Sequence, residues 1–228
     1  MTQTRRHFLR TTAATAGAIT LLPFAALADA HASNVFEAAS GETITVHPVA
    51  HASFVMETQV GAIYVDPVGD PAQYSDFPKP DLILITHEHG DHFNQDTLDA
   101  LDSGETQFIT NARVFEKISD VMKNRTQTAD NSTRNQNLFR EIKIDTIAAY
   151  NTTEGREKFH PKGRDNGYVL NFEGFRIYIS GDTEDIPEMR ALKDIDLAFV
   201  CMNLPFTMGI EQAAQGVAAF KPAVVYPY

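Results

Sequence analysis

Cysteine is almost absent from this chain: its 228 residues include one cysteine, Cys201, and no tryptophan. A single cysteine excludes an internal disulfide framework. Because Cys201 ends the apolar run at residues 197–201, we expect a buried structural thiol rather than a nucleophile. The chain also contains no Gly-x-Ser-x-Gly sequence. It therefore lacks the nucleophile elbow that many serine hydrolases use.

Positive charge is also scarce. The chain carries 19 Lys and Arg against 30 Asp and Glu, a formal net charge of -11 at pH 7. Such an acidic surface repels phosphate backbones and anionic lipid headgroups, which argues against nucleic acid and membranes as partners and leaves a small-molecule substrate. After residue 30 the sequence shows no repeat, linker or change of composition. About 200 residues suit one domain with a sizeable core.

Long apolar runs are missing except near the N-terminus. The N-terminal region contains the arginine pair Arg5-Arg6, the bulky apolar pair Phe8-Leu9 and a further arginine, Arg10. An Ala-rich stretch follows at residues 11–27. It leads into two Ala-x-Ala sequences, Ala26-Leu27-Ala28 and Ala28-Asp29-Ala30. This order is typical of a secretory signal, and the arginine pair resembles the twin-arginine export class. We expect residues 1–30 to be a signal peptide read by the twin-arginine export machinery, and residues 31–228 to be one periplasmic or secreted domain. A stable membrane anchor is the alternative, but the run is shorter than the ~20 residues that span a bilayer.

Short apolar runs bounded by turn residues predict strands in two clusters. The first is expected at residues 43–46, 53–57, 62–65 and 82–85, and the second at 138–150, 167–172, 175–180, 196–202 and 223–226. Helices are expected from the N-cap Asn94 through Asp102, from the N-cap Asn111 through about Lys123, and at 187–193 and 211–220. Two sheets packed face to face with helices outside, an α/β fold, satisfy this order. The polar segment 123–137 is expected to be an exposed loop, either a lid or a plain surface insertion.

Four side chains that can bind a metal ion fall within six residues, in Thr86-His87-Glu88-His89-Gly90-Asp91-His92-Phe93, directly after the buried strand at 82–85. Residues two apart in an extended chain point the same way, so His87 and His89 can reach one ion together. Gly90 permits a sharp turn that carries Asp91 and His92 round to a second position. Neutral imidazoles with a carboxylate suit zinc or a similar divalent cation.

This His-x-His-x-Asp-His sequence resembles the metallo-β-lactamase superfamily, and the resemblance extends from about Val46 to the last residue. Tyr64-Val65-Asp66-Pro67 is similar to an early strand whose aspartate supports the metal-binding loop. Ser180-Gly181-Asp182-Thr183 is similar to a later strand end whose aspartate bridges two metals. Four motifs resemble the branch that contains ascorbate-phosphate-lactonase-like hydrolases: His51-Ala52-Ser53-Phe54, Phe159-His160-Pro161-Lys162-Gly163, Gly167-Tyr168-Val169 and Gly181-Asp182-Thr183. The resemblance implies an αββα four-layer sandwich.

The resemblance also implies a set of ligands for two zinc ions. These are His87 and His89 for the first ion, Asp91 and His92 for the second, and Asp182 between them, with Asp91 and Asp182 as the catalytic carboxylates.

Three further positions follow from the resemblance less directly. The third histidine of the first ion is assigned to His160, with Asn151 as its rival. Asp66 and His51 are expected to orient the ligands from behind, although a plain turn or core histidine is also open for His51. Residues 203–208 are expected to line the mouth of the site.

The family's last ligand is a histidine that follows the final strand, and the chain ends at Tyr228 without it. We therefore expect a sandwich lacking its C-terminal end, as in a fragment. The alternative is a complete protein whose second metal site is short of one ligand, and which is single-metal or inactive.

The activity implied is that of a zinc-dependent hydrolase whose metal-bound hydroxide attacks an ester, lactone or phosphoester. Asp91 would hold the second ion and shuttle a proton. Lys162 and Arg164 either bind an anionic group of the substrate or belong to a solvated loop. Two other classes stay open. One is an iron-containing redox protein, which visible absorbance would reveal, and the other is a non-catalytic or single-metal periplasmic protein, which metal content would separate from the rest.

Overall fold

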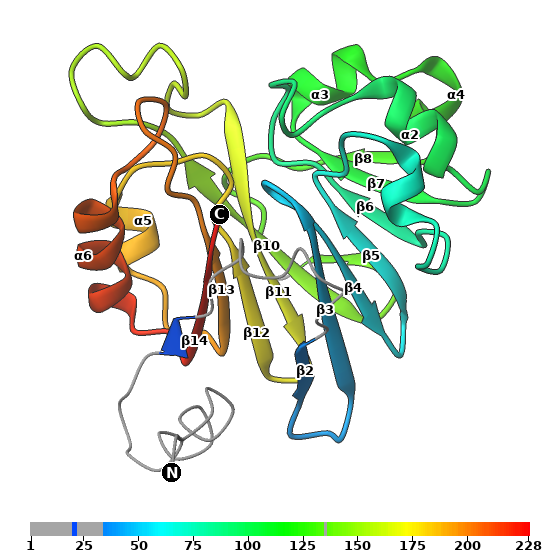
Figure 1. Ribbon diagram of the computed structural model, residues 1–228, viewed down its shortest axis with the longest axis horizontal. Coiled ribbons are helices and arrows are strands. Elements are labelled where there is room, and N and C mark those ends of the chain that lie inside the picture. Colours follow the sequence, from blue (N-terminus) through cyan, green and yellow to red (C-terminus); the bar gives the residue numbers. More distant parts are fainter. Residues whose placement is uncertain (1–19, 22–33, 135) are drawn as a thin grey trace, which may run out of the picture.

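Two seven-stranded sheets pack face to face, and helices cover the outer face of each (Figure 1). The computed structural model describes residues 20–21, 34–134 and 136–228. Within that part of the chain, no helix is long and apolar enough to cross a lipid bilayer. The expected signal peptide, residues 1–30, lies outside the described residues apart from Thr20 and Leu21.

The first sheet follows the chain, in the order β2-β3-β4-β5-β6-β7-β8. Its strands are β2 (Asn34–Glu37), β3 (Thr43–Ala50), β4 (Ser53–Thr58), β5 (Gly61–Val65), β6 (Leu82–Leu84), β7 (Gln107–Thr110) and β8 (Thr126–Thr128). Strands β2 to β5 are antiparallel and β5 to β8 are parallel. Parallel neighbours need crossover connections. The helices α2 (Gln95–Leu101), α3 (Ala112–Lys117) and α4 (Asp120–Lys123) lie in those connections.

The second sheet has the order β1-β14-β13-β12-β11-β10-β9. Its strands are β1 (Thr20–Leu21), β9 (Gln136–Phe139), β10 (Ile142–Ala149), β11 (Asp165–Phe172), β12 (Phe175–Ile179), β13 (Leu197–Val200) and β14 (Val224–Pro227). Strands β9 to β12 are antiparallel, whereas β12, β13, β14 and β1 are parallel. The helices α5 (Pro187–Arg190) and α6 (Ile210–Phe220) connect the parallel strands and cover their outer face (Figure 1).

The central strands of both sheets, such as β6 and β13, are buried on two sides, which explains their unbroken apolar sequences. In β5, Ile63 and Val65 face the opposite sheet, while Tyr64 faces the helices. The two sheets meet directly where the rings of Phe54 and Phe199 stack, with centroids 3.9 Å apart. The expected four-layer arrangement is therefore confirmed.

Two local expectations were wrong. One helix was expected from Asn111 to about Lys123, but there are two, because Ile118 and Ser119 adopt extended ψ angles of 147°. The polar segment 123–137 is not only a loop, because β8 lies within it and pairs with the edge of β7. Polar side chains suit an edge strand, since part of its surface faces water.

Candidate metal centre

The expected site residues all come from connections at one edge of the sandwich. His51 lies between β3 and β4, Asp66 directly after β5, His87 to His92 after β6, His160 between β10 and β11, and Asp182 after β12. The carboxyl ends of the parallel strands β5, β6 and β12 point to this edge, which brings residues from both sheets together. The topology therefore places on one rim side chains that are up to 131 residues apart in the chain.

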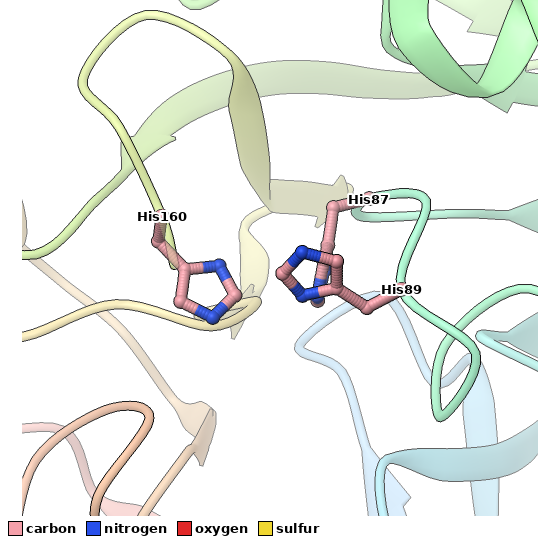
Figure 2. A group of neighbouring side chains, drawn as sticks. All are labelled: His87, His89 and His160. Carbon is pink, nitrogen blue, oxygen red and sulfur yellow. The ribbon is translucent and has the colours of Figure 1, made fainter. Parts of the chain in front are cut away.

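Three histidines form an inner group, His87, His89 and His160 (Figure 2). Figure 2 shows His87 and His89 entering from the loop after β6 and His160 from the opposite side. The ring centroids of His87 and His89 are 4.6 Å apart, and that of His160 lies 5.0 and 4.9 Å from them. Their ligating nitrogens all lie within 4.8 Å of one another. One divalent cation could bind all three.

Asp66, directly after β5, is hydrogen-bonded to the loop that follows β6. Its Oδ1 accepts a hydrogen bond from the Thr86 amide at 2.8 Å, and its Oδ2 accepts one from the Thr86 hydroxyl at 2.7 Å. The same Oδ2 lies 2.7 Å from Nδ1 of His92. Asp66 adopts a left-handed φ of 43°, which is uncommon outside glycine and directs its carboxylate back under the loop. This carboxylate therefore leaves Nε2 of His92 as the atom that faces the site.

His160 has an equivalent partner that the sequence reasoning missed. Its Nδ1 lies 3.0 Å from Oδ2 of Asp165, which is fully buried at the start of β11. Arg164 binds both oxygens of Asp165, at 2.6 and 2.8 Å, so this carboxylate is itself fixed. The only sequence signal was an aspartate five residues after the histidine, directly before the strand.

Asp182 lies between the histidines of the two sheets. Its Oδ1 is 3.3 Å from Nε2 of His92, and its Oδ2 is 3.3 Å from Nε2 of His160. The preceding Gly181 has a φ of 60°, and a Cβ at that position would come within 2.6 Å of the Asn166 carbonyl. Glycine is therefore required here to bring the backbone of Asp182 close to β11.

His51, Asp91 and His92 form an outer group, which is more exposed. Nε2 of His51 lies 3.4 Å from Oδ2 of Asp91, and Nε2 of His92 lies 3.9 Å from the same oxygen. The side chains of His51 and Asp91 are 36% and 48% exposed, whereas His92 is fully buried. The turn that presents Asp91 is closed by bonds from the His92 and Phe93 amides to the His89 carbonyl. Gly90 lies in this turn but has no positive φ, so the turn does not need glycine's conformational freedom.

Burial and neighbouring charges divide the histidines into two kinds. Burial, reinforced by His92, lowers the pKa of His87 well below its ordinary value, and burial with His160 nearby lowers the pKa of His89. Both rings are therefore neutral, the form that binds metal ions. Burial would also lower the pKa of His92, but the carboxylates of Asp182 and Asp66 outweigh it and raise that pKa well above its ordinary value. A cation that binds Nε2 of His92 would therefore displace a proton.

The carboxylates respond in the opposite direction. Burial would raise the pKa of Asp182, but the neighbouring imidazoles of His92 and His160 hold it well below its ordinary value. A hydrogen bond from His51 lowers the pKa of Asp91. Both carboxylates are therefore ionised and can accept a cation.

The donor set fits a divalent cation. Among the described residues, Nε2 of His87, Nε2 of His92 and Oδ1 of Asp182 are buried without a hydrogen-bond partner. A buried polar atom without a partner costs about 1–3 kcal/mol of stability. A ligand atom of each of these three residues lies within 4.8 Å of those of the other two, so cations bound among them would satisfy all three. Imidazole nitrogens with carboxylate oxygens are ligands that zinc and similar divalent ions accept.

Asn151, the rival of His160, is engaged through its amide nitrogen by two neighbouring loops. Its side-chain amide donates to the carbonyls of Arg156 and Phe206, at 3.0 and 2.6 Å, and ties two loops together. The same loop is anchored by the buried Glu184, whose Oε2 accepts four hydrogen bonds from the amides and hydroxyls of Thr152 and Thr153. The geometry therefore favours His160 over Asn151 as a ligand.

A cavity of about 230 Å³ opens above the inner group. It is lined by His89, Asp91, Phe159, His160, Asp182 and Phe206. Phe159 and Phe206 pack edge to face with centroids 5.1 Å apart and form its apolar wall. Phe206 lies in the segment 203–208 that was expected at the mouth of the site. Cys201 is buried behind it, and burial raises the pKa of its thiol to about 12, in keeping with the expected structural role.

Lys162 and Arg164 do not line this cavity. The ammonium of Lys162 donates to the Tyr150 hydroxyl at 3.1 Å and pairs with Glu188 at 3.3 Å. Arg164 is held by Asp165 and lies 3.7 Å from Glu88. Both side chains are therefore engaged by protein groups, and neither lines the cavity.

A two-sheet sandwich with a histidine and aspartate cluster at one edge defines the class of metallo-β-lactamase-like proteins. The sequence profile of the beta-lactamase superfamily domain matches residues 31–228, and the chain belongs to this family.

Individual relatives agree with the family assignment. A metal-dependent hydrolase of the UPF0173 group from Pyrococcus horikoshii is 29% identical over 203 residues, which cover 81% of this chain and 83% of the relative. One from Thermococcus onnurineus is 30% identical over 203 residues, with the same coverage. The crystal structure of a protein described as a metal-dependent hydrolase from Parabacteroides distasonis has a TM-score of 0.80 at 42% identity and covers 87% of each chain. Igni18, a metallo hydrolase from Ignicoccus hospitalis, shares the fold with a TM-score of 0.65 at 21% identity and covers 81% of each chain.

Proposed function

We propose that this chain is a metal-dependent hydrolase that binds two divalent cations, preferentially zinc, and cleaves carboxylic esters or lactones. The observation that carries the proposal is the convergence of buried histidine and aspartate atoms that have no hydrogen-bond partner among the described residues. The names of the relatives support the hydrolase class.

The ligands follow the geometry of the two groups. His87, His89 and His160 would hold one cation, Asp91 and His92 the other, and Asp182 would contact both. The bound cations would polarise a substrate carbonyl and lower the pKa of water to about 7. Asp91 is ionised and half exposed, so its carboxylate can take a proton from the attacking water and release it to solvent. Asp66 and Asp165 hold His92 and His160 in the tautomer that presents Nε2.

The lining of the cavity supports an uncharged ester over a phosphoester. Phe159 and Phe206 offer an apolar wall to the acyl or alcohol group. Neither lysine nor arginine is among the lining residues, and the nearby Lys162 and Arg164 are engaged by carboxylates. A phosphate group would find no arginine or lysine among the residues that line the cavity, whereas phosphate sites usually include one.

The test compares metal content and hydrolysis in one preparation. The metal-free protein, prepared with a chelator, should be inactive. Addition of about two equivalents of Zn²⁺ should restore hydrolysis of p-nitrophenyl butyrate more than of bis-p-nitrophenyl phosphate. Iron that absorbs visible light in the purified protein would instead support the redox class. Tight binding of two zinc ions without hydrolysis of any ester, lactone or phosphoester would contradict the proposal.

Export is a separate proposal, supported by the arginine pair and the Ala-x-Ala sequences of residues 1–30. Replacement of Arg5 and Arg6 by lysine should keep the protein in the cytoplasmic fraction of a bacterial host, while the unaltered chain reaches the periplasm. Equal periplasmic amounts of both would show that the twin-arginine route is not used.

A further inference from the structure

The outer group contains an imidazole to which the relatives' names and the family profile assign no role. The ligating atoms of His51, Asp91 and His92 all lie within 4.8 Å of one another. His92 is fully buried, and its Nδ1 is already bound to Asp66. Its Nε2 has no hydrogen-bond partner among the described residues and lies 3.9 Å from Oδ2 of Asp91. A buried nitrogen that has no hydrogen-bond partner and faces a carboxylate and a second imidazole is in the environment expected of a cation ligand.

The backbone holds His51 in this position. His51 forms the tip of the β3–β4 hairpin with a φ of 46°, a left-handed conformation that is unfavourable for a residue with a Cβ. Backbone strain of this kind persists where the surrounding structure imposes it, and it is common at functional sites. Two residues later, the buried hydroxyl of Ser53 donates to the Asp66 carbonyl at 2.6 Å. Asp66 therefore fixes both the hairpin that carries His51 and the imidazole of His92.

We infer that His51 is a third protein ligand of the second cation, together with Asp91 and His92. The inference rests on the proposed two-cation function. It differs from the role expected from the sequence, in which His51 only orients another ligand. Two imidazoles and one carboxylate are a common donor set for zinc, and the remaining position would go to Asp182, water or the substrate. Oδ1 of Asp182 lies 3.3 Å from Nε2 of His92 and has no hydrogen-bond partner among the described residues.

The test measures zinc stoichiometry and affinity in the full chain, by dialysis against chelator-buffered Zn²⁺ followed by elemental analysis. The variant is His51→Asn, because asparagine tolerates the left-handed backbone and lacks the imidazole. The matched control is Glu173→Asn, which also replaces an exposed residue with positive φ at a hairpin tip, at the opposite end of β11 from the site. Circular dichroism and thermal unfolding verify that both variants fold.

Each outcome decides the inference. If His51 is a ligand, the wild-type chain and Glu173→Asn bind two zinc ions, and His51→Asn keeps one while its second affinity falls more than about 100-fold. That loss exceeds the ~10–100-fold cost of removing a residue that only orients a ligand. A smaller loss, or none, would make His51 an orienting or bystander residue and leave the proposed function intact. A wild-type chain that binds one zinc ion or none would overturn both the inference and the two-cation proposal.

Discussion

The two sheets contribute to the metal centre in different ways. The first sheet supplies His87, His89, Asp91 and His92 from one loop of six residues directly after β6. The second sheet supplies His160 and Asp182 from two loops, with Phe206 from a third. Most of the first-sheet side is therefore encoded locally, and the second-sheet side is assembled by the topology of the sheet.

The two sides nevertheless use the same device to orient their histidines. Asp66 binds Nδ1 of His92 at 2.7 Å, and Asp165 binds Nδ1 of His160 at 3.0 Å. Both carboxylates are buried, and both are fixed by a further donor, Thr86 or Arg164. The comparison shows that a metal centre can combine a local motif with distant residues if each imidazole has its own anchored carboxylate.

Among the variants that test this comparison, replacements of these two carboxylates have the largest expected effect. Asp66→Asn should weaken binding of the second cation, and Asp165→Asn binding of the first, each by about 10–100-fold, because the amide no longer fixes the imidazole tautomer. Asparagine tolerates the left-handed φ of Asp66, so that backbone should stay in place. The measurement is the zinc affinity of each cation site, determined separately in each of the two variants. A change confined to the same cation in both variants would refute the division of the centre between the two sheets.

A smaller effect is expected on the wall that the second sheet contributes. Phe206→Ala should raise KM for an ester with an apolar acyl group about 10-fold with little change in kcat, because an aromatic contact is worth roughly 1.5 kcal/mol and acts on the bound substrate. Leu204→Ala is the matched control, since Leu204 is exposed in the same loop but does not line the cavity. Steady-state kinetics with acetyl and butyryl esters provide the measurement. An equal effect of both variants would place the substrate elsewhere.

The smallest expected effect concerns the thiol of Cys201, which directly follows β13 in the second sheet. Cys201 is fully buried and its pKa is raised to about 12, so little thiolate forms at pH 8. A maleimide should therefore label the denatured chain but not the folded one, and activity should persist during treatment of the folded protein. Rapid labelling under native conditions would show that the loop above Cys201 opens readily.

The sequence by itself indicated the fold and most of the candidate site. The unbroken apolar runs predicted strands covered on both faces, and the N-cap side chains of Asn94 and Asn111 bond to the first turns of α2 and α3 as expected. The spacing of His87 and His89 was informative because residues two apart on an extended chain share a face. These are local properties, which is why periodicity and spacing reveal them.

Only the tertiary structure decided which distant residues meet. The sequence did not predict the role of Asp165, because a spacing of five residues between His160 and Asp165 does not specify a hydrogen bond between them. The choice between His160 and Asn151 depended on which loop side chain points inward. His51 lies beside Asp91 because the tip of the β3–β4 hairpin meets the turn after β6. The two residues are 40 positions apart in the chain. The sequence determined the chemistry that is available, and the packing of two sheets determined which atoms share a cation, because their distances are set by long-range contacts that no local pattern records.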